Sequence, residues 1–580
     1  MRAIAAFCAT PLSRLPIVPQ LIMKSNYAWK ASLIIAMVAI GVLRAAPTET
    51  KDESETVKLF AHEASIHVQG RTGKVAALTQ SNGEQGYSPE KAKGFHVQVV
   101  NQLSVPTSIH WHGLILPNLM DGVPFVTQDP IPPGGSRRCD FPLKQSGSYW
   151  MHSHYGLQEQ QLLSAPMVIR SAVQSKVADA EFTVMLSDFS FTSPQNILKG
   201  LLGKAQGMKG KRQEKGMPDS KPMSMPEQKE LLVVQQWDVA SKRLVSREVQ
   251  AALPDVDVNY DSLLANQRTI DNPRVFEVKP GQNVLLRVIG AASATNFFID
   301  TGAVDATIIA TDGEEVQPLK GNFFQLSTAQ RLDLLITIPR TGGVFPILAL
   351  AEGTSLQAGV VLTTPGAKIP KQPFGIRAQR TMGGLDNTQE IRLIAKKPLA
   401  DKPVQRSLPS VLGGNMMTYT WTINGTPYPN RNSLNVKEGE RVELVISNTT
   451  GMSHPMHLHG HVFEVTEIDG KKIAGAKRDT ILVPPKSTIK VGFDADNPGV
   501  WAYHCHILYH LATGMFTVLK YENADTKFWK PDSAPTELEN PLELNNATEF
   551  WREMTTELFA DGQTHARSVA RRSNAGNANR

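Results

Sequence analysis

Short runs of Val, Ile, Thr and aromatic residues recur along the chain, and Gly and Pro stand between them. Examples are FHVQVVNQL from Phe95, QNVLLRVIG from Gln282, RLDLLITIP from Arg331, RVELVISN from Arg441 and STIKVGF from Ser487. Many short strands bounded by turn residues are typical of β-sandwiches and barrels. Long helical periodicity is scarce before residue 545. The pattern predicts an all-β protein.

The sequence contains an internal repeat. Residues 132–154 (PPGGSRRCDFPLKQSGSYWMHSH) align without a gap on residues 484–506 (PPKSTIKVGFDADNPGVWAYHCH), and both histidine pairs coincide. Upstream, the HWHG that begins at His110 aligns in the same way on the HLHG that begins at His457. The repeat indicates that two β-domains carry equivalent sets of histidines.

A third copy of the scaffold carries no histidine. The stretch VKPGQNVLLRV from Val278 resembles VKEGERVELVI from Val436, yet no histidine occurs between His154 and His454. We therefore predict three related β-domains, of which the outer two hold the chemistry. The predicted segments are a targeting segment at 1–46, domains at 52–172, 173–375 and 376–525, and a tail at 526–580.

Composition narrows the class of protein. The 580 residues are 41% hydrophobic and 20% charged, which excludes collagen-like and wholly disordered chains. Part of the net charge of +6 comes from a Lys-rich stretch at 204–221 and from an Arg-rich end. Basic and aromatic residues are not interleaved, so we expect no nucleic-acid partner. Residues 204–227 are expected to form a Lys- and Met-rich loop, and ATEFWREMTTELFA in the tail an amphipathic helix.

The N-terminal segment resembles an export signal. An uncharged apolar run of thirteen residues follows Lys30 and ends at Leu43. This run is too short to cross a bilayer comfortably, so we expect no stable membrane span. Initiation at Met23 would leave a compact signal, but LRAAPTE is a poor cleavage site. Export is predicted, while cleavage and retention as a short anchor both stay open.

Export makes disulfides possible, but the chain has three cysteines only, Cys8, Cys139 and Cys505. Cys8 would leave with the signal. Cys139 lies in the strand-like stretch SRRCDFPL. We interpret it as a small buried thiol, with a reactive cysteine as the alternative.

Ten of the fifteen histidines lie in four short clusters. These are HWH at 110–112, HSH at 152–154, HPMHLH at 454–459 and HCHILYH at 504–510. An HxH pair in a strand turns both imidazoles to one face. If these histidines were ordinary core residues, each buried ring would need its own hydrogen-bond partner. So many rings facing one space could not all find one. Clusters at duplicated positions therefore favour metal binding over a structural role.

The stretch WAYHCHILYHLATGM indicates which metal. Structural zinc is usually held by four Cys or His ligands and gives no reason for a methionine. Two histidines, a cysteine and a weak axial methionine form the blue-copper ligand set. Cys505, His510 and Met515 lie on one loop, and His454 is available as the second imidazole. The eight imidazoles that remain also suit copper.

These motifs resemble those of the multicopper oxidases. HWHG, HSH, HPxHLHG and HCHxxxHxxxxM are matched at every ligand, and the resemblance runs over residues 52–525. It implies three cupredoxin-like domains with the Greek-key β-sandwich or barrel fold, and four copper ions. The implied ligands are His454, Cys505, His510 and Met515 for type 1 copper, His110 and His457 for type 2, and His112, His152, His154, His459, His504 and His506 for the type 3 pair.

The family takes single electrons at type 1 copper and reduces dioxygen to two waters at the other three ions. Cys505 is covalently continuous with His504 and His506, which gives electrons a bonded path. An axial methionine implies a lower type 1 potential. Asp121 in MDGVP matches the family's acidic residue near type 2 copper and is expected to relay protons; its alternative is a turn residue before Gly122. Some relatives place a glutamate where this chain has Leu511, so the second proton donor is not identified.

Within the family, QSGSYWMHSHYGLQEQ, MDGVP, MLSDFS and TYTWTINGTPYPN are most similar to the bacterial copper-resistance, or CopA-type, branch. That branch is periplasmic and carries methionine-rich inserts, whose thioethers prefer Cu(I). The candidates in this chain are Met208, Met217, Met223, Met225, Met416 and Met417. The lysines around the first four would repel Cu(I), so a plain loop and a Cu(I)-collecting loop both stay open.

We expect an exported oxidase in copper tolerance that couples oxidation of Cu(I), of phenols, or of both to reduction of dioxygen. A laccase-like phenol oxidase and a copper-sequestering protein with incidental oxidase activity are the alternatives. His62, His67, His96, His461 and His565 are expected to bind no copper.

Overall fold

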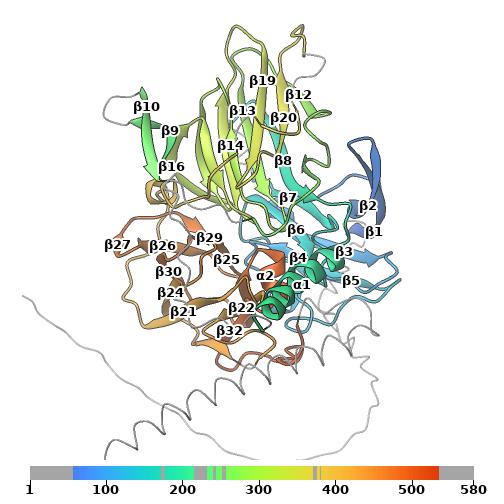
Figure 1. The fold of residues 1–580 in the computed structure, drawn as a ribbon, viewed down its shortest axis with the longest axis vertical. Coiled ribbons are helices and arrows are strands. Elements are labelled where there is room, and N and C mark those ends of the chain that lie inside the picture. Colours follow the sequence, from blue (N-terminus) through green and yellow to red (C-terminus); the bar gives the residue numbers. More distant parts are fainter. Residues whose placement is uncertain are drawn as a thin grey trace, which may run out of the picture. The chain divides into compact units, whose positions relative to one another are not determined.

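The computed structural model describes residues 56–171, 177–213, 231–238, 243–250, 256–369, 375–378, 381–430 and 432–534. The predicted targeting segment, most of the tail with its expected helix, and His565 lie outside the described residues. Nearly all described elements are strands, as Figure 1 shows. The fold is all-β, with three cupredoxin-type domains, as the hydrophobic pattern and the resemblance predict.

The first domain pairs a four-stranded sheet, in the order β2-β1-β3-β5, with a three-stranded sheet, β4-β6-β7. In β3 every second residue is buried, so one face contributes to a core that includes Leu59 and Trp111. The strands are β1 Val57–Val68, β2 Arg71–Gln80, β3 Phe95–Asn101, β4 Ile109–His112, β5 Ser136–Phe141, β6 Gly147–Ser153 and β7 Ser164–Ile169.

The middle domain pairs a six-stranded sheet, β11-β8-β13-β18-β15-β16, with a five-stranded sheet, β12-β20-β19-β14-β17. Its strands are β8 Ala180–Phe189, β11 Ser262–Ala265, β12 Arg274–Glu277, β13 Asn283–Gly290, β14 Phe297–Asp300, β15 Ala306–Thr311, β16 Glu314–Gly321, β17 Phe323–Leu326, β18 Arg331–Thr337, β19 Val344–Ala351 and β20 Gln357–Thr363. A separate hairpin is formed by β9 Leu231–Asp238 and β10 Arg243–Gln250.

The third domain has the sheets β22-β21-β24-β30-β26-β27, with β28 beside β26, and β23-β32-β31-β25-β29. Its strands are β21 Arg406–Asn415, β22 Thr420–Ile423, β23 Ser433–Val436, β24 Arg441–Asn448, β25 His454–Leu458, β26 Phe463–Ile468, β27 Lys471–Lys472, β28 Lys477–Arg478, β29 Thr480–Val483, β30 Thr488–Asp494, β31 Val500–Cys505 and β32 Phe516–Tyr521. The short helix α2, Leu508–Ala512, follows β31.

The repeat found in the sequence is visible in the strand register. In the first domain His110 of β4 pairs with His152 of β6. In the third domain His457 of β25 pairs with His504 of β31, and Met456 pairs with Cys505. Equivalent antiparallel pairs therefore carry the two sets of histidines.

One long helix differs from the sequence-based expectation. Helix α1, Pro194–Gln213, continues through residues 204–213, where a loop was expected. Its apolar residues form one short stripe, in which Leu198 and Leu201 are buried against Tyr509 of α2. Because the stripe covers only the first half of the helix, the sequence carried little helical periodicity. Among the described residues there are also the 3-10 helices η2 Lys91–Lys93, η3 Asn118–Met120 and η5 Glu390–Arg392.

The first residues of the predicted tail pack onto the first domain. Lys530 donates its backbone N–H to the Phe125 carbonyl, and its ammonium lies 2.8 Å from Asp129. Within the described ranges, no helix has both the length and the apolar character needed to cross a bilayer.

Candidate metal centres

Three side chains of the third domain converge on one point. The Cys505 sulfur lies 3.7 Å from His454 Nδ1 and 3.6 Å from His510 Nδ1, and the two nitrogens are 3.2 Å apart. All three residues are fully buried. The outer nitrogens of the two rings lie near polar atoms: His454 Nε2 is hydrogen-bonded to Thr450 Oγ1 at 2.8 Å, and His510 Nε2 lies 2.8 Å from Asp257 Oδ2.

These separations fit a single metal ion. Bonds of about 2.0 Å to nitrogen and 2.3 Å to sulfur, at roughly tetrahedral angles, require ligand atoms about 3.3 to 3.5 Å apart. Met515 is fully buried in the same core as Cys505, and its carbonyl accepts the Cys505 backbone N–H at 3.1 Å. His454, Cys505 and His510 are therefore brought together by β25, β31 and α2, and Met515 lies in the same core between α2 and β32.

Eight further histidines gather between the first and third domains, and all are buried. Six of the rings donate one N–H to a fixed acceptor at 2.8 to 3.2 Å. The acceptors are the carbonyl oxygens of Asp121 for His110, Ser153 for His152, Asp479 for His457 and Cys505 for His504, and the carboxylates of Asp479 for His112 and Asp121 for His459.

The opposite nitrogens of these rings are left for a metal. His110 Nε2, His112 Nδ1, His152 Nε2 and His457 Nε2 are buried without a hydrogen-bond partner. A buried polar atom without a partner is costly unless it binds an ion or water. An N–H bond on one nitrogen fixes the tautomer, so the other nitrogen presents a lone pair.

Lone pairs also face one another across the domain boundary. His504 Nε2 lies 3.0 Å from His459 Nε2 and 3.3 Å from His154 Nε2. His459 and His504 both donate from Nδ1, so their Nε2 atoms are acceptors that repel each other unless a cation lies between them. The residues present therefore fit metal ions.

The protonation state of the histidine cluster also favours metal binding. Burial is the main cause that lowers the pKa of seven of the eight rings, and for His504 the pKa falls to about 4. The others with a lowered pKa are His112, His152, His154, His457, His459 and His506. Neutral imidazole is the form that binds metal.

The ligand atoms form overlapping groups, since His110 converges with His457 and His459 and also with His112 and His152. His154, His459 and His504 form one group of converging atoms, and His110 and His457 belong to another. The His506 ring lies 5.1 Å, centre to centre, from both His112 and His152. The backbone of Cys505 joins His504 and His506 to the type 1 residues, and the assignment of these two rings to different type 3 ions stays a prediction.

Asp121 touches ligands from both outer domains. Its Oδ2 accepts from His459 Nδ1 at 2.9 Å, while its carbonyl accepts from His110. It is fully buried and is followed by Gly122, whose φ is +88°. A Cβ at Gly122 would collide with the Ile109 carbonyl, so Asp121 is both a turn residue and a carboxylate beside the histidines. Its part in proton relay stays a prediction.

Sequence reasoning missed two carboxylates at this site. Glu159 Oε2 lies 3.0 Å from His152 Nδ1, and Oε1 lies 3.8 Å from His506 Nδ1. Burial raises the pKa of Glu159, which lines a cavity of about 10 Å³, roughly the size that holds one water. Asp479 bonds His112 and His457. No motif signals Asp479, whereas Glu159 follows HSH by five residues and could have been considered.

The other histidines, Cys139 and the methionines singled out in the sequence are only partly covered by the described residues. His461 lies 2.9 Å from the His459 carbonyl and 2.7 Å from the Tyr521 hydroxyl, so both of its nitrogens are bonded. His96 Nδ1 lies 2.9 Å from Asp140. Cys139 is buried, and burial raises the pKa of its thiol to about 11, as expected of a structural cysteine. Met208 belongs to α1 but its side chain is not described, and Met217, Met223 and Met225 lie outside the described residues.

Comparisons with known proteins agree with this site. Three sequence models described as Multicopper oxidase match residues 89–174, 231–367 and 401–525. The chain is 35% identical over 426 residues to Multicopper oxidase MmcO of Mycobacterium tuberculosis, a match that covers 73% of this chain and 79% of that one. It is 26% identical over 547 residues to a Copper resistance protein A homolog of Pseudomonas syringae pv. tomato. That match covers 79% of this chain and 91% of the relative.

Solved structures show the same fold. Fet3p, a multicopper oxidase that functions in iron import, superposes with a TM-score of 0.63 at 20% identity, over 85% of this chain and 95% of that chain. His454, Cys505 and His510 would hold a copper ion that takes up single electrons, and the eight histidines would hold the ions that supply electrons to dioxygen. The family match, the relative at 35% identity and the converging ligands together establish that the chain belongs to the multicopper oxidases, enzymes that bind four copper ions and use dioxygen as electron acceptor.

Proposed function

We propose that this multicopper oxidase oxidises Cu(I) in copper tolerance. The observation that carries the proposal is a small cavity beside the predicted type 1 residues. Asp257 lines it and lies 2.8 Å from His510 Nε2, so one carboxylate connects the cavity to a type 1 histidine. The Asp257 Oδ1 atom is buried and has no hydrogen-bond partner, which leaves it available to a cation or a hydroxyl donor.

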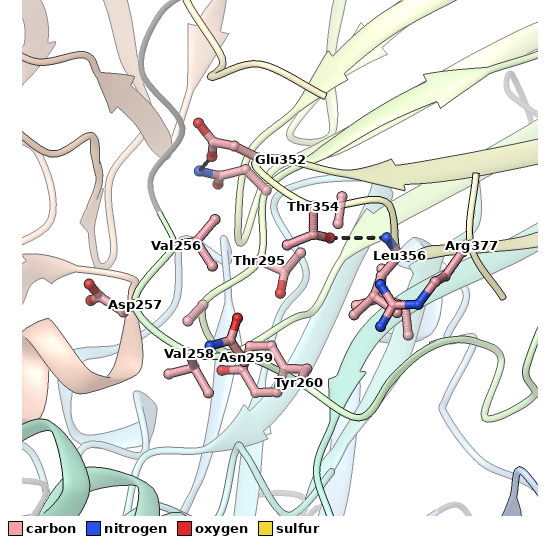
Figure 2. A pocket seen from close by; sticks show the side chains of 14 residues that line it. Val256, Asp257, Val258, Asn259, Tyr260, Thr295, Glu352, Thr354, Leu356 and Arg377 are labelled. Carbon is pink, nitrogen blue, oxygen red and sulfur yellow. Dashed lines mark hydrogen bonds between the residues drawn. The ribbon is translucent and has the colours of Figure 1, made fainter. Parts of the chain in front are cut away.

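The size of the cavity favours a small donor. Its volume is about 120 Å³. Sites for drug-sized molecules usually have about 300 to 1,000 Å³. Figure 2 shows the segment from Val256 to Tyr260 along one side of the cavity, with Thr354, Leu356 and Arg377 across from it. A copper ion with a few waters fits this space more readily than a substituted phenol does.

Two exposed methionines lie close to the same residues along the chain. Met416 and Met417 stand at the turn between β21 and β22, and each is 43% exposed. Tyr419, two residues further on, donates its hydroxyl to Asp257 Oδ2 at 2.6 Å. Thioethers prefer Cu(I) over harder ions, so this turn is suited to deliver Cu(I) toward Asp257. Relatives named for copper resistance support a part in copper tolerance.

The decisive experiment compares donors. Oxygen uptake is measured with Cu(I) and with a dimethoxyphenol, for the wild type and for Cys505→Ser. We expect turnover with Cu(I) that Cys505→Ser abolishes. Turnover with the phenol alone would favour a laccase-like enzyme, and no turnover with either donor would favour copper sequestration; each result would overturn the proposal.

The methionine turn is tested separately. Met416→Ser combined with Met417→Ser should raise the KM for Cu(I) and leave the KM for the phenol unchanged. Val411→Ser is the matched control, because Val411 lies on β21 and is 39% exposed without a thioether. An unchanged KM for Cu(I) in the double variant would remove the turn from Cu(I) delivery.

We propose a phenol oxidase as the second candidate, because the cavity also has apolar walls. Val258, Leu263 and Leu356 line it, and Tyr260 offers an aromatic face. A small phenol whose hydroxyl donates to Asp257 Oδ1 is the donor that these walls would suit.

We propose that the protein acts after export, in a bacterial periplasm. The apolar run that ends at Leu43 supports export. Cell fractionation, with N-terminal sequencing of the exported protein, tests the location and the cleavage site together. Recovery of the chain from the cytoplasm alone would contradict it.

A further inference from the structure

The middle domain holds none of the predicted copper ligands, yet it sends one side chain to the histidine site. Arg331, the first residue of β18, is fully buried. Its Nη1 and Nη2 donate to the two carboxylate oxygens of Asp479, at 2.8 and 2.5 Å. Nε donates to the Ser148 carbonyl of the first domain at 3.0 Å. One guanidinium therefore links all three domains.

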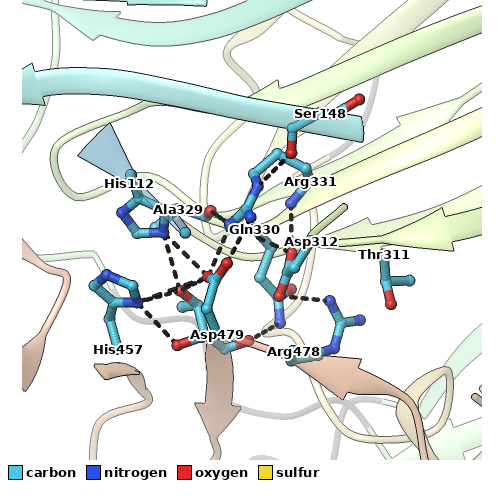
Figure 3. Close-up of polar contacts among 12 residues, drawn as sticks. His112, Ser148, Thr311, Asp312, Ala329, Gln330, Arg331, His457, Arg478 and Asp479 are labelled. Carbon is cyan, nitrogen blue, oxygen red and sulfur yellow. Dashed lines mark hydrogen bonds and ion pairs between the residues drawn. The ribbon is translucent and has the colours of Figure 1, made fainter. Parts of the chain in front are cut away.

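Asp479 is also hydrogen-bonded to two histidines, His112, a predicted type 3 ligand, and His457, a predicted type 2 ligand. Its Oδ1 accepts from His112 Nε2 at 3.2 Å, and its carbonyl accepts from His457 Nδ1 at 2.8 Å. Figure 3 shows Arg331, Asp479 and the two rings as one connected set of polar contacts. His112 is thereby obliged to present Nδ1 to a metal, whereas His457 presents Nε2.

The motif glycine of HWHG makes room for this ion pair. Gly113 has a φ of +87°, and a Cβ there would lie 2.5 Å from both Arg331 Nη2 and Asp479 Oδ2. No other residue type fits between the guanidinium and the carboxylate at this distance. The packing therefore connects Gly113 to the Arg331–Asp479 ion pair, and through that pair to the rings of His112 and His457.

We propose that Arg331 is a positioning residue for the trinuclear copper site, acting through Asp479 on His112 and His457. A bidentate guanidinium fixes the plane of a carboxylate, which a lysine ammonium does not do. Without it, the Asp479 carboxylate is buried with no cation, and besides His112 the only described hydrogen-bond partner that restrains its plane is the Thr480 hydroxyl, 2.9 Å from Oδ1. Partners of metal ligands typically contribute about 10- to 100-fold to metal affinity.

A purely structural role predicts something different, and Arg478 provides the matched control. Arg478 is also fully buried, lies next to Asp479 in sequence and pairs with Glu390 at 2.8 Å and with Asp312 at 3.2 Å. These contacts join Arg478 to two carboxylates and to no histidine of the site. If Arg331 only joins domains, loss of either arginine should have the same consequences.

The test uses the full chain loaded with copper, as wild type, Arg331→Lys, Arg331→Met, Gly113→Ala and Arg478→Lys. Copper per chain is measured by mass spectrometry, retention of copper against a chelator by titration, and the type 2 ion by its electron paramagnetic resonance signal. The blue type 1 absorption reports that the third domain is folded. The readouts need no electron donor, so they are independent of the proposed function.

We expect Arg331→Lys and Gly113→Ala to hold type 2 copper about 10- to 100-fold less tightly, with an altered type 2 signal and an unchanged blue absorption. Arg331→Met should lose that ion altogether. Arg478→Lys should keep four copper ions and lose thermal stability only. Wild-type affinity and signal in Arg331→Lys, or an equal loss in Arg478→Lys, would overturn the proposal. If Arg331→Met does not fold, Arg331→Lys alone decides.

Discussion

Replacing His461 by Gln should make this protein more resistant to acid. His461 is 3% exposed, and burial lowers its pKa to about 4. In an unfolded chain a histidine has a pKa of about 6.5. As the pH falls below that value, the unfolded chain takes up a proton and the folded chain does not. Stability is therefore lost between about pH 6.5 and pH 4, and no further loss comes from His461 at lower pH.

The size of the effect follows from this difference. One pKa unit corresponds to about 1.4 kcal/mol, so His461 destabilises the fold by about 2 kcal/mol at pH 5 and by about 3 kcal/mol below pH 4. For a domain of roughly 150 residues, about 2 kcal/mol lowers the unfolding midpoint by about 4 to 8 °C. A glutamine does not titrate, so it removes this part of the acid sensitivity.

The assay is thermal unfolding at pH 7.5 and pH 5, followed by tryptophan fluorescence in the wild type and in His461→Gln. The readout is the drop in midpoint between the two pH values, because a constant cost of the substitution cancels in that difference. The variant should show the smaller drop both with and without copper, since His461 is bonded to the His459 carbonyl and to Tyr521 and binds no metal. Equal drops in both proteins would refute the reasoning.

Three further predictions concern the copper sites and the second cysteine. Met515→Leu should raise the type 1 potential, as measured by redox titration of the blue absorption, and an unchanged potential would argue against an axial Met515. Gly122→Ala should lower the copper content of the trinuclear site while sparing the blue absorption, because a Cβ there collides with the Ile109 carbonyl beside His110. Cys139 should react with a thiol reagent at pH 8.5 at least about 100-fold more slowly than in the unfolded chain, because a pKa of about 11 leaves few thiolates; rapid labelling in the folded state would contradict this.

The sequence was most informative where chemistry requires fixed spacing. The alternation of a strand explains why HWH and HCH each turn two rings to one face, and the repeat located the paired strands β4 with β6 and β25 with β31. Asp257 and Arg331 could not be predicted in the same way, since each is a single residue far in sequence from the rings it serves, whereas Glu159 lies only seven residues after His152. Their roles depend on packing between domains, which leaves no local pattern. Helix α1 was missed because its apolar stripe is short.

The distance between the two copper centres and the integrity of the eight-histidine cluster depend on different parts of the structure. His504 and Cys505 are neighbours on β31, where successive side chains point to opposite faces. The separation between the electron-accepting site and the dioxygen site is thus set by bond lengths within one strand. The eight-histidine cluster, in contrast, is divided between two domains and is held by contacts that thermal motion loosens. Mild destabilisation should therefore impair dioxygen chemistry well before it lengthens the route that electrons take.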